Sequence, residues 1–370
     1  MGEKSQIEGL RVAVLGAGAN GSIIASDLAE SGVDVTVIDQ WPANIDAIRE
    51  RGIRVQLGDT ERVTRVPAHH LCEVAEMREP FDAVLLVMKA YDTRWATELI
   101  TPLLHEDSFV VGVQNGMTAD AIAHVIGAER TVGAVIEVTS AMYTPGLVER
   151  HSAPERCWFA VGALDPAAER HVPVAAELLR CVGIVEETDD IQSVKWMKLI
   201  LNVAELVTSA VLDLSISDCA RYPGMREVML AAGNEAVAVA QAHGYALRPI
   251  FGMAGDEAAS PETYVASILD NLVENYIQPN SRATVLQDWM KHRRSEVVEL
   301  HDEVVRLSRR YGLESPVNAR ILELGLKIES GELVASPANV ELMRQALRQP
   351  VLVPARRITQ PRDRAGSPRR

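Results

Sequence analysis

Hydrophobic and polar positions follow two different patterns along the chain. Up to about residue 190, short runs rich in Val, Ile and Leu alternate with segments whose apolar residues recur at helical spacing. Beyond that point, apolar residues recur at helical spacing over long stretches, and few runs are typical of strands. Strand-like runs that alternate with helices indicate a sheet covered by helices. We therefore predict the α/β fold class, with an all-helical C-terminal domain after the sheet.

The individual runs give the expected elements. We predict strands over residues 11–16, 33–39, 53–57, 82–88, 108–114, 130–139 and 157–162. We predict helices over residues 191–212, 224–243, 261–275, 283–311 and 316–329. Residues 288–310 form the longest uninterrupted helical pattern, and Gly244 and Gly312 supply stop signals. The predicted domains cover residues 1–190 and 191–345.

The last stretch, residues 346–370, has a different composition. It holds seven arginines against one acid, Asp363, together with four prolines and no apolar periodicity. Such a segment cannot bury enough apolar surface to fold by itself. We predict a disordered basic tail without a catalytic role.

Composition excludes several classes of protein. A formal net charge of −14 argues against a general binder of nucleic-acid backbones. No apolar run approaches the roughly 20 residues that cross a membrane, and the four cysteines lie far apart, as in proteins of a reducing compartment. The nine histidines include no HExxH pair, so we predict no metal. We expect a cytoplasmic protein with neither nucleic acid nor membrane as a partner.

The sequence VAVLGAGANG, residues 12–21, reads as a strand, a glycine turn and the start of a helix. In this pattern Gly16 permits the tight turn, Gly18 lets the backbone approach a pyrophosphate, and Gly21 lets the helix pack closely on the sheet. The helix N-terminus, with Ala19 and Asn20, then faces the phosphates. This predicts an N-terminal Rossmann dinucleotide-binding domain; the alternative is a glycine-rich turn without a ligand.

Asp39 ends the second predicted strand, about 20 residues after the glycines, where a carboxylate can accept hydrogen bonds from the ribose hydroxyls of an adenosine. It would repel a 2′-phosphate, and the next residues, Gln40 and Trp41, offer no cation to neutralise one. We therefore expect NAD(H) to be favoured over NADP(H). Alternatively, Asp39 is an ordinary acid that caps the turn after its strand.

Two polar residues follow other predicted strands. Lys89 comes after the strand over residues 82–88, and Asn115 after the strand over 108–114. Ligands of open α/β sheets bind at the carboxyl ends of the strands. We therefore expect both side chains to reach the cofactor, and Asn115 to reach the substrate as well.

Four further segments carry a resemblance when they are taken together and in order. They are VMKAYDT at 87–93, VQNGMT at 113–118, SVKWMKLILN at 193–202 and LQDWMKHRRSEV at 286–297. With the glycine turn, they make residues 11–335 resemble the ketopantoate reductase (2-dehydropantoate 2-reductase) family. That resemblance implies NAD(P)H-dependent reduction of a 2-keto acid to a 2-hydroxy acid, in a cleft between a Rossmann domain and a helical domain.

The resemblance also implies roles for individual residues. Lys198 matches the family's catalytic lysine in the motif Trp196-Met197-Lys198-Leu199, and we assign it as the general acid. An ammonium that hydrogen-bonds the keto oxygen stabilises the negative charge that forms there and delivers the proton. Asn202, four residues on, lies on the same helix face and matches a family asparagine. Lys195, one turn earlier, is the alternative reactive amine.

Glu296 and Thr284 complete the site that the resemblance implies. Glu296 matches the family's substrate-binding glutamate, although charge runs on helices are usually solvated. Thr284 takes the place of a serine that holds the substrate. Leu206 stands where many members have a second asparagine, which leaves the identity of the keto or hydroxy substrate open. The segment over residues 246–282, longer than expected for the family, is predicted to line the cleft or a dimer contact.

Two other functions are compatible with the same residues. A dehydrogenase of the 3-hydroxyacid type also joins a Rossmann domain to helices and uses a lysine on the first helix after it. A non-catalytic NAD(H) sensor would use the glycine turn without Lys198. In each case the exposed apolar faces of a helical domain make a homodimer plausible, and we predict one.

Overall fold

Strand β1 (Arg11–Leu15) lies inside the sheet because its side chains are apolar on both faces. In the computed structural model, which describes residues 5–255 and 260–348, the large sheet has the strand order β12-β11-β8-β7-β6-β1-β2-β5. Its other strands are β2 (Asp34–Asp39), β5 (Ala68–His70), β6 (Phe81–Leu86), β7 (Leu104–Gly112), β8 (Thr131–Glu137), β11 (Trp158–Ala163) and β12 (Ile184–Glu187). The pairing is parallel from β5 to β8, and β11 runs antiparallel to β8. The predicted α/β class is confirmed.

Alternate side chains of β1 enter two different cores. Val12 and Val14 pack with α1 and α5, whereas Ala13 and Leu15 pack with α3 and α4. The helices that cover the sheet are α1 (Ala19–Glu30), α2 (Pro42–Arg51), α3 (Thr93–Ile100), α4 (Ala119–Ile126) and α5 (Val172–Arg180). This two-sided burial explains why the strands read as continuous apolar runs.

A second, smaller sheet has the strand order β4-β3-β10-β9 within the described part of the chain. Its strands are β3 (Ile53–Leu57), β4 (Thr60–Thr64), β9 (Ser140–Thr144) and β10 (Leu147–Arg150). Only β3 is predicted from the sequence. β4 is largely exposed and polar, and β9 and β10 are short, so none of the three carries the apolar pattern of a buried strand.

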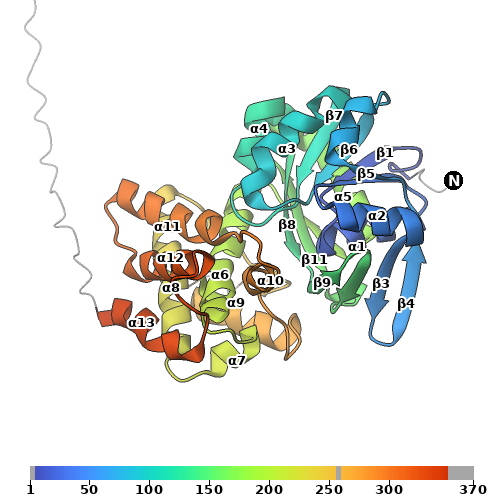
Figure 1. Cartoon of the computed structure of the whole chain (residues 1–370). Helices are drawn as coiled ribbons and strands as arrows, with labels where there is room; N and C mark the ends of the chain where they lie inside the picture. Colours follow the sequence, from blue (N-terminus) through green and yellow to red (C-terminus); the bar gives the residue numbers. More distant parts are fainter. Residues whose placement is uncertain (1–4, 256–259, 349–370) are drawn as a thin grey trace, which may run out of the picture.

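Helix α6 (Ile191–Val211) is the centre of the helical lobe, and every one of its residues except Gln192 is buried. A helix that is covered on all sides must lie inside a core. It packs against α8 on one side and against β8 and β11 of the sheet on the other, so it belongs to both lobes (Figure 1). The other helices of this lobe are α7 (Ile216–Arg221), α8 (Met225–His243), α9 (Pro261–Asn275), α10 (Thr284–Met290), α11 (Val297–Tyr311), α12 (Pro316–Glu329) and α13 (Val340–Arg344).

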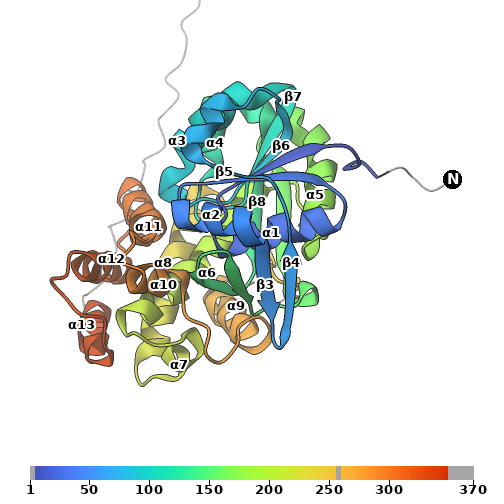
Figure 2. The same ribbon diagram turned by 45° about the vertical axis from the view of Figure 1, so that its right-hand side comes forward.

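In Figure 1, α10 lies on the side of the helical lobe that faces the sheet, and Figure 2 shows the same fold turned by 45°. Short 3-10 helices lie at Leu71–Glu76, Ala90–Asp92, Thr101–Leu103, Ala128–Arg130, Pro154–Arg156, Pro166–His171, Pro337–Asn339 and Gln345–Arg348.

No helix in residues 5–255 and 260–348 is long and apolar enough to cross a bilayer. Residue 190, where we expect the domain boundary, is the N-cap of α6.

The predicted helix over residues 283–311 is wrong, because the chain leaves the helix after Met290 and re-enters it at Val297. Between them His292 has a positive φ of 53°. Ser295 donates its backbone N–H to Glu329 at 2.8 Å, and the Glu296 carboxylate accepts the backbone N–H of Ala90 at 2.8 Å. These tertiary contacts outweigh a local preference for helix.

The predicted disordered tail, residues 346–370, falls outside the described residues from 349 onward. The first three of its residues belong to the 3-10 helix Gln345–Arg348, and Ala346 is buried. The folded part of the chain therefore extends slightly beyond the predicted end of the second domain.

Arg150, at the end of β10, ties the small sheet to the large domain. Its guanidinium donates to Asp27 of α1 at 2.7 Å, to the Ser152 carbonyl at 2.8 Å and to the Val182 carbonyl at 3.1 Å. The side chains of Arg150 and Asp27 are both buried. Without Arg150, the buried Asp27 would keep, among the described residues, only Arg62 as an ion-pair partner, and the two carbonyl oxygens would lose their donor.

We expect Arg150→Met to lower the free energy of unfolding by roughly 3 kcal/mol, since buried pairs lose about that much when one partner is removed. Chemical denaturation measures the loss, as the shift in the denaturant midpoint between variant and wild type when both have the same m-value. The matched control is Arg54→Met in β3 of the same sheet, whose ion pair with Glu61 is on the surface and should contribute far less to stability, because water screens exposed charges. Equal losses in the two variants would contradict the structural role given to Arg150.

Candidate active site

The glycine turn between β1 and α1 leaves room for a ligand. Gly16 has a φ of 108°, and a Cβ there would lie 2.7 Å from the backbone nitrogen of Met88. A Cβ on Gly21 would collide with the carbonyl oxygen of Gly16. Gly18, the N-cap of α1, faces open space, with no atom of the described chain within 4 Å of a Cβ built there. The turn therefore has the geometry that a pyrophosphate at a helix N-terminus requires.

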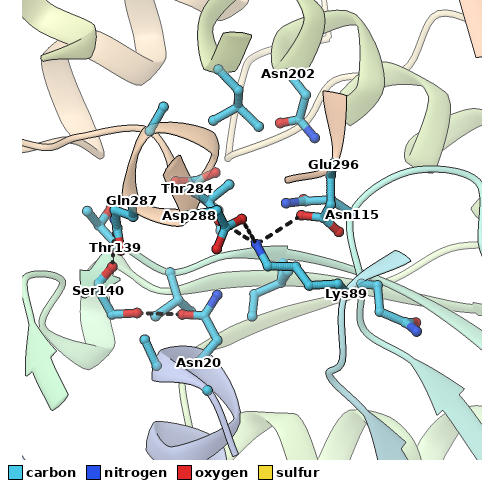
Figure 3. A pocket seen from close by; sticks show the side chains of 18 of the residues that line it. Asn20, Lys89, Asn115, Thr139, Ser140, Asn202, Thr284, Gln287, Asp288 and Glu296 are labelled. Atoms are coloured by element: carbon cyan, nitrogen blue, oxygen red, sulfur yellow. Dashed lines mark hydrogen bonds and ion pairs between the residues drawn. The ribbon is translucent and has the colours of Figure 1, made fainter. Parts of the chain in front are cut away.

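Gly18 and the first residues of α1 line a cavity of about 240 Å³ between the two lobes. Ala19, Asn20 and Gly21 lie on its wall. Asn20 is held by Ser140, whose hydroxyl donates to the Asn20 side-chain oxygen at 2.7 Å (Figure 3). The predicted cofactor residues of the turn thus open into the same cavity as the residues described below.

Asp39 does not line this cavity. Its carboxylate accepts the backbone N–H of Ala17 at 2.5 Å and that of Trp41 at 2.7 Å. Burial raises the pKa of Asp39, and these two hydrogen bonds oppose the rise. The carboxylate therefore braces the turns after β1 and β2, as in the alternative interpretation of this residue, and both of its oxygens are engaged.

A cation lies beside the end of β2, and it does not come from the neighbouring sequence. The guanidinium carbon of Arg293 is 4.1 Å from the centre of the Trp41 ring, and its charge acts on Asp39. Arg293 also lines the cavity. It comes from the turn between α10 and α11, so the sequence around residue 40 contains no signal for it.

Lys89 joins the two lobes across the cavity. Its ammonium donates to Asp288 at 2.6 Å, to the Thr284 hydroxyl at 3.0 Å and to Glu296 at 3.4 Å (Figure 3). Burial alone would lower the pKa of Lys89, but the charges of Glu296 and Asp288 outweigh it and raise the pKa. The predicted residues Lys89, Thr284 and Glu296 are thus in direct contact. Asp288 was missed as a site residue, although its position four residues after Thr284 puts both on one helix face.

Lys198 and Asn202 face the cavity from α6. The Lys198 ammonium donates to the Glu137 carboxylate at the end of β8, and it lies 5.0 Å from the centre of the Phe251 ring. The Asn202 side chain is fully buried, and neither its oxygen nor its nitrogen has a hydrogen-bond partner in the described residues. A buried amide without a partner is costly. Its position on the cavity wall therefore points to a ligand as the missing partner.

Lys195 points away from the cavity. Its ammonium donates to the carbonyl oxygens of Gln114 and Ala134, both at 3.0 Å, and burial lowers its pKa to about 7. The two lysines of the motif are therefore separated, one toward the cavity and one toward the sheet. Lys195 fastens α6 to the strands that carry the Asn115 turn.

Asn115 lies on the cavity wall in the turn after β7, where Gly116 has a φ of 74°. The segment over residues 246–282 contributes Phe251 beside Lys198, and Ile277, Ser281 and Arg282 on the wall. It therefore lines the cleft, one of the two roles expected for it. Among the described residues, no group of three or more His, Cys, Asp or Glu side chains is placed to hold a metal.

Two acids near Lys198 are not identified as site residues by the sequence. The first is Glu137, and the second is Glu205. It is 3% exposed and lies on the cavity wall, and its Oε2 has no hydrogen-bond partner among the residues described. Burial raises its pKa to about 8, the charge of Lys198 opposes this and that of Glu137 adds to it. Glu205 is the one acid of α6 and lies seven residues after Lys198, on the same helix face, and this is the signal that would have found it.

Family models match most of the chain. The model described as ketopantoate reductase PanE/ApbA matches residues 12–163, and the one described as ketopantoate reductase PanE/ApbA C terminal matches residues 190–329. The 2-dehydropantoate 2-reductase of Archaeoglobus fulgidus is 25% identical over 327 residues, which cover 87% of this chain and 98% of that one.

Solved structures agree with this similarity. A PanE/ApbA family ketopantoate reductase from Ralstonia eutropha is 26% identical, with a TM-score of 0.73 over 87% of this chain and 99% of the other. A D-mandelate dehydrogenase with NADH and anilino(oxo)acetate has a TM-score of 0.77 over 87% of this chain and 99% of its own. At 20% identity it supports the fold alone.

The expected preference for NAD(H) over NADP(H) is wrong. The curated relatives are 2-dehydropantoate 2-reductases, and ketopantoate reductases depend on NADPH. The physical reason lies in two residues. The Asp39 carboxylate, which was expected to bind ribose hydroxyls, is engaged by backbone N–H groups, and Arg293 brings a positive charge to the end of β2 from the other lobe.

The contacts of Lys89 lead to a prediction on stability. In Lys89→Met, the buried carboxylates of Asp288 and Glu296 lose their shared cation. We expect the variant to be less stable at pH 7.5 by roughly 3 kcal/mol. Burial raises the pKa of Asp288, and Lys89 opposes this rise more than Lys291 does, so the Asp288 pKa in the folded variant lies further above the unfolded value of about 3.9.

A carboxyl whose pKa is higher in the folded state stabilises the fold most below its unfolded pKa, and this contribution is lost as pH rises through the folded pKa. The deficit of Lys89→Met should therefore be smaller at pH 5 than at pH 7.5, as measured by melting temperatures against wild type. Lys327→Met, which removes a lysine of α12 that pairs with Glu323 outside the cavity, is the control. The same deficit at both pH values would rule out this explanation.

Proposed function

The chain belongs to the ketopantoate reductase family, whose members are NADP-dependent oxidoreductases acting on a keto group, and we propose that it reduces a 2-keto acid or a related keto compound to the corresponding hydroxy compound. The observation that carries the proposal is the pair formed by Lys198 and the unpartnered Asn202. Both face the cavity into which the glycine turn opens. The reverse oxidation would use the same groups.

The glycine turn fits the cofactor that this reaction needs. Gly18, Ala19, Asn20 and Gly21 would hold the pyrophosphate at the N-terminus of α1, where the backbone N–H groups and the helix dipole favour an anion. Arg293 would contact a 2′-phosphate at the end of β2, since an arginine at this place is what accommodates that group. NADPH, when bound, supplies the hydride to the keto carbon. Asn115 and Lys89 would border its nicotinamide end.

We assign the proton transfer to Lys198. Its ammonium is held by Glu137 and would donate a hydrogen bond to the keto oxygen, where negative charge develops as the carbon is reduced. It would then give its proton to that oxygen. Asn202 would orient the same oxygen, because its side-chain amide has no hydrogen-bond partner among the described residues. Lys195 would position the helix rather than react, since two carbonyl oxygens hold its ammonium away from the cavity.

Glu296 and Thr284 would complete the substrate side. Thr284, on the cavity wall, offers a hydroxyl for the substrate's carboxylate. Glu296 shares Lys89 with Asp288 and is fixed by the Ala90 N–H, so it can accept a hydrogen bond from a substrate hydroxyl in a defined direction. The matched family models favour this function over a 3-hydroxyacid-type dehydrogenase and over a non-catalytic sensor.

A cytoplasmic location and a homodimer stay predictions. The four cysteines, all within the described residues, are free, which agrees with a reducing compartment. The oligomeric state can be measured directly by light scattering.

Lys198→Ala should lower kcat by about 10³, within the range of 10² to 10⁴ typical of a lost general acid. The affinity for NADPH should stay within about twofold, because Lys198 lies away from the pyrophosphate turn. NADPH oxidation with a panel of 2-keto acids measures the first quantity, and NADPH fluorescence the second. Lys198→Arg is the control: it keeps the charge but, with a pKa above about 12, gives up no proton. Turnover close to wild type in Lys198→Ala would refute the assignment.

Arg293→Ala should raise the KM for NADPH at least tenfold, because a charge-assisted hydrogen bond is worth about 1.5 to 3 kcal/mol and about 1.4 kcal/mol is a factor of ten. The KM for NADH should change little, since NADH lacks the 2′-phosphate. Arg294→Ala is a matched control. Its guanidinium carbon lies 4.1 Å from the Tyr91 ring, the same distance as Arg293 from Trp41, but it is away from the cavity wall. An equal rise in the KM for NADPH and for NADH in Arg293→Ala would show that Arg293 does not bind the 2′-phosphate.

A further inference from the structure

One side chain of the cavity wall has no part in the reaction described above. Glu205 lies three residues after Asn202 and seven after Lys198 on α6, so the three side chains share one helix face and all line the cavity. Glu205 is 3% exposed and its Oε2 has no hydrogen-bond partner in the described part of the chain. Buried carboxyl groups that serve a structural purpose are hydrogen-bonded. An unpaired one on a cavity wall lacks a partner that a ligand would supply.

The groups around Glu205 leave it without a cation of its own. On its own helix it faces Lys198, from β8 it faces Glu137, and from α7 it faces the thiol of Cys219. Lys198 is already paired with Glu137. Glu137 and Glu205 therefore share one base, Lys198, in a buried space. Glu205 can therefore offer a carboxyl group to a ligand without a cation of its own, since Arg282, which also lines the cavity, is paired with Asp213.

The position of Glu205 tells which part of a substrate it would meet. Along α6 it lies about 4.5 Å beyond Asn202, at about 1.5 Å per residue, on the side away from Lys198. If Lys198 and Asn202 hold the keto oxygen, Glu205 faces the tail of the substrate. Leu206, Ile216 and Ile277 line the same cavity, so the tail would pass apolar side chains.

We propose that Glu205 is the residue that selects the substrate's tail: it binds a tail group that can donate a hydrogen bond, such as a hydroxyl, and rejects a second carboxylate. This inference rests on the proposed reduction of a 2-keto acid. A hydroxyl can donate to Glu205 and fill its missing contact. Once Glu205 is ionised, a carboxylate has no proton to donate to it and would place a second negative charge against a buried acid that has no base of its own.

Three four-carbon 2-keto acids that differ only at C4 test the proposal: 4-hydroxy-2-oxobutanoate, 2-oxobutanoate and oxaloacetate. With NADPH at pH 9, where most of Glu205 is ionised, we expect wild type to have a kcat/KM at least tenfold higher for the hydroxyl compound than for the carboxylate compound, with the methyl compound between them. In Glu205→Gln, which keeps the size but cannot ionise, that ratio should fall at least fivefold. Glu299→Gln removes a half-buried acid that does not line the cavity and should leave the ratio unchanged.

The pH dependence of the ratio separates a contact with substrate from a structural effect. The pKa of Glu205 is raised to about 8 by burial, so Glu205 ionises between pH 6.5 and 9. In wild type the discrimination against oxaloacetate should grow over this range, and in Glu205→Gln it should stay flat. Because both substrates are compared on the same enzyme, changes in the protonation of Lys198 cancel in the ratio.

The outcomes are distinct. A kcat/KM ratio in Glu205→Gln that matches wild type at every pH overturns the proposal. A wild-type ratio that does not change with pH also overturns it, and this second test does not depend on the folding of a variant. If wild type reduced none of the keto acids, the proposed function would fail. Glu205 would then be tested by melting-temperature shifts with NADP⁺ and either 2,4-dihydroxybutanoate or malate. A larger shift with the dihydroxy compound, lost in Glu205→Gln, supports the selection of the tail; equal shifts overturn it.

Discussion

The burial of α6 against both the sheet and the helical lobe is the constraint on which the rest of the structure depends. All but one of its residues are covered, so the helix cannot rotate or slide without disrupting two cores. Lys195 adds a polar anchor, because its ammonium is held by carbonyl oxygens of the strands. The polar side chains on the cavity face of α6 thereby acquire fixed directions, and a reaction that depends on the placement of one proton needs such fixed directions.

The charges of the cavity follow from the same arrangement. Each lysine that faces the cavity from near the sheet or from α6 is held by carboxylates from elsewhere in the chain: Lys89 by two acids of the helical lobe, and Lys198 by Glu137 of β8. Contacts of this kind keep a buried ammonium charged, because an opposite charge nearby offsets the cost of removing it from water. Glu205 stands outside this pairing, and this sets it apart from the other acids of the site.

The sequence predicts those features that depend on neighbours along the chain. The glycine turn, six strands of the large sheet and α6 have local patterns that the tertiary structure keeps, whereas the short strands β5 and β12 are not predicted. The paired positions Lys198 and Asn202 follow from helical spacing alone. The features that failed depend on distant contacts. The helix over residues 283–311 breaks because Ser295 and Glu296 bind Glu329 and Ala90. Asp39 is occupied by amides that its own sequence does not reveal, and Glu137 meets Lys198 across 61 residues.

The break between α10 and α11 has a consequence for the motion of the two lobes. It places Arg293 and Arg294 next to each other in an extended turn, each over a different aromatic ring of the sheet domain, while Glu296 binds Ala90 two residues further on. The three contacts lie within four consecutive residues, and each joins the helical lobe to the sheet domain. Any movement that separated the two lobes at this point would have to break all three.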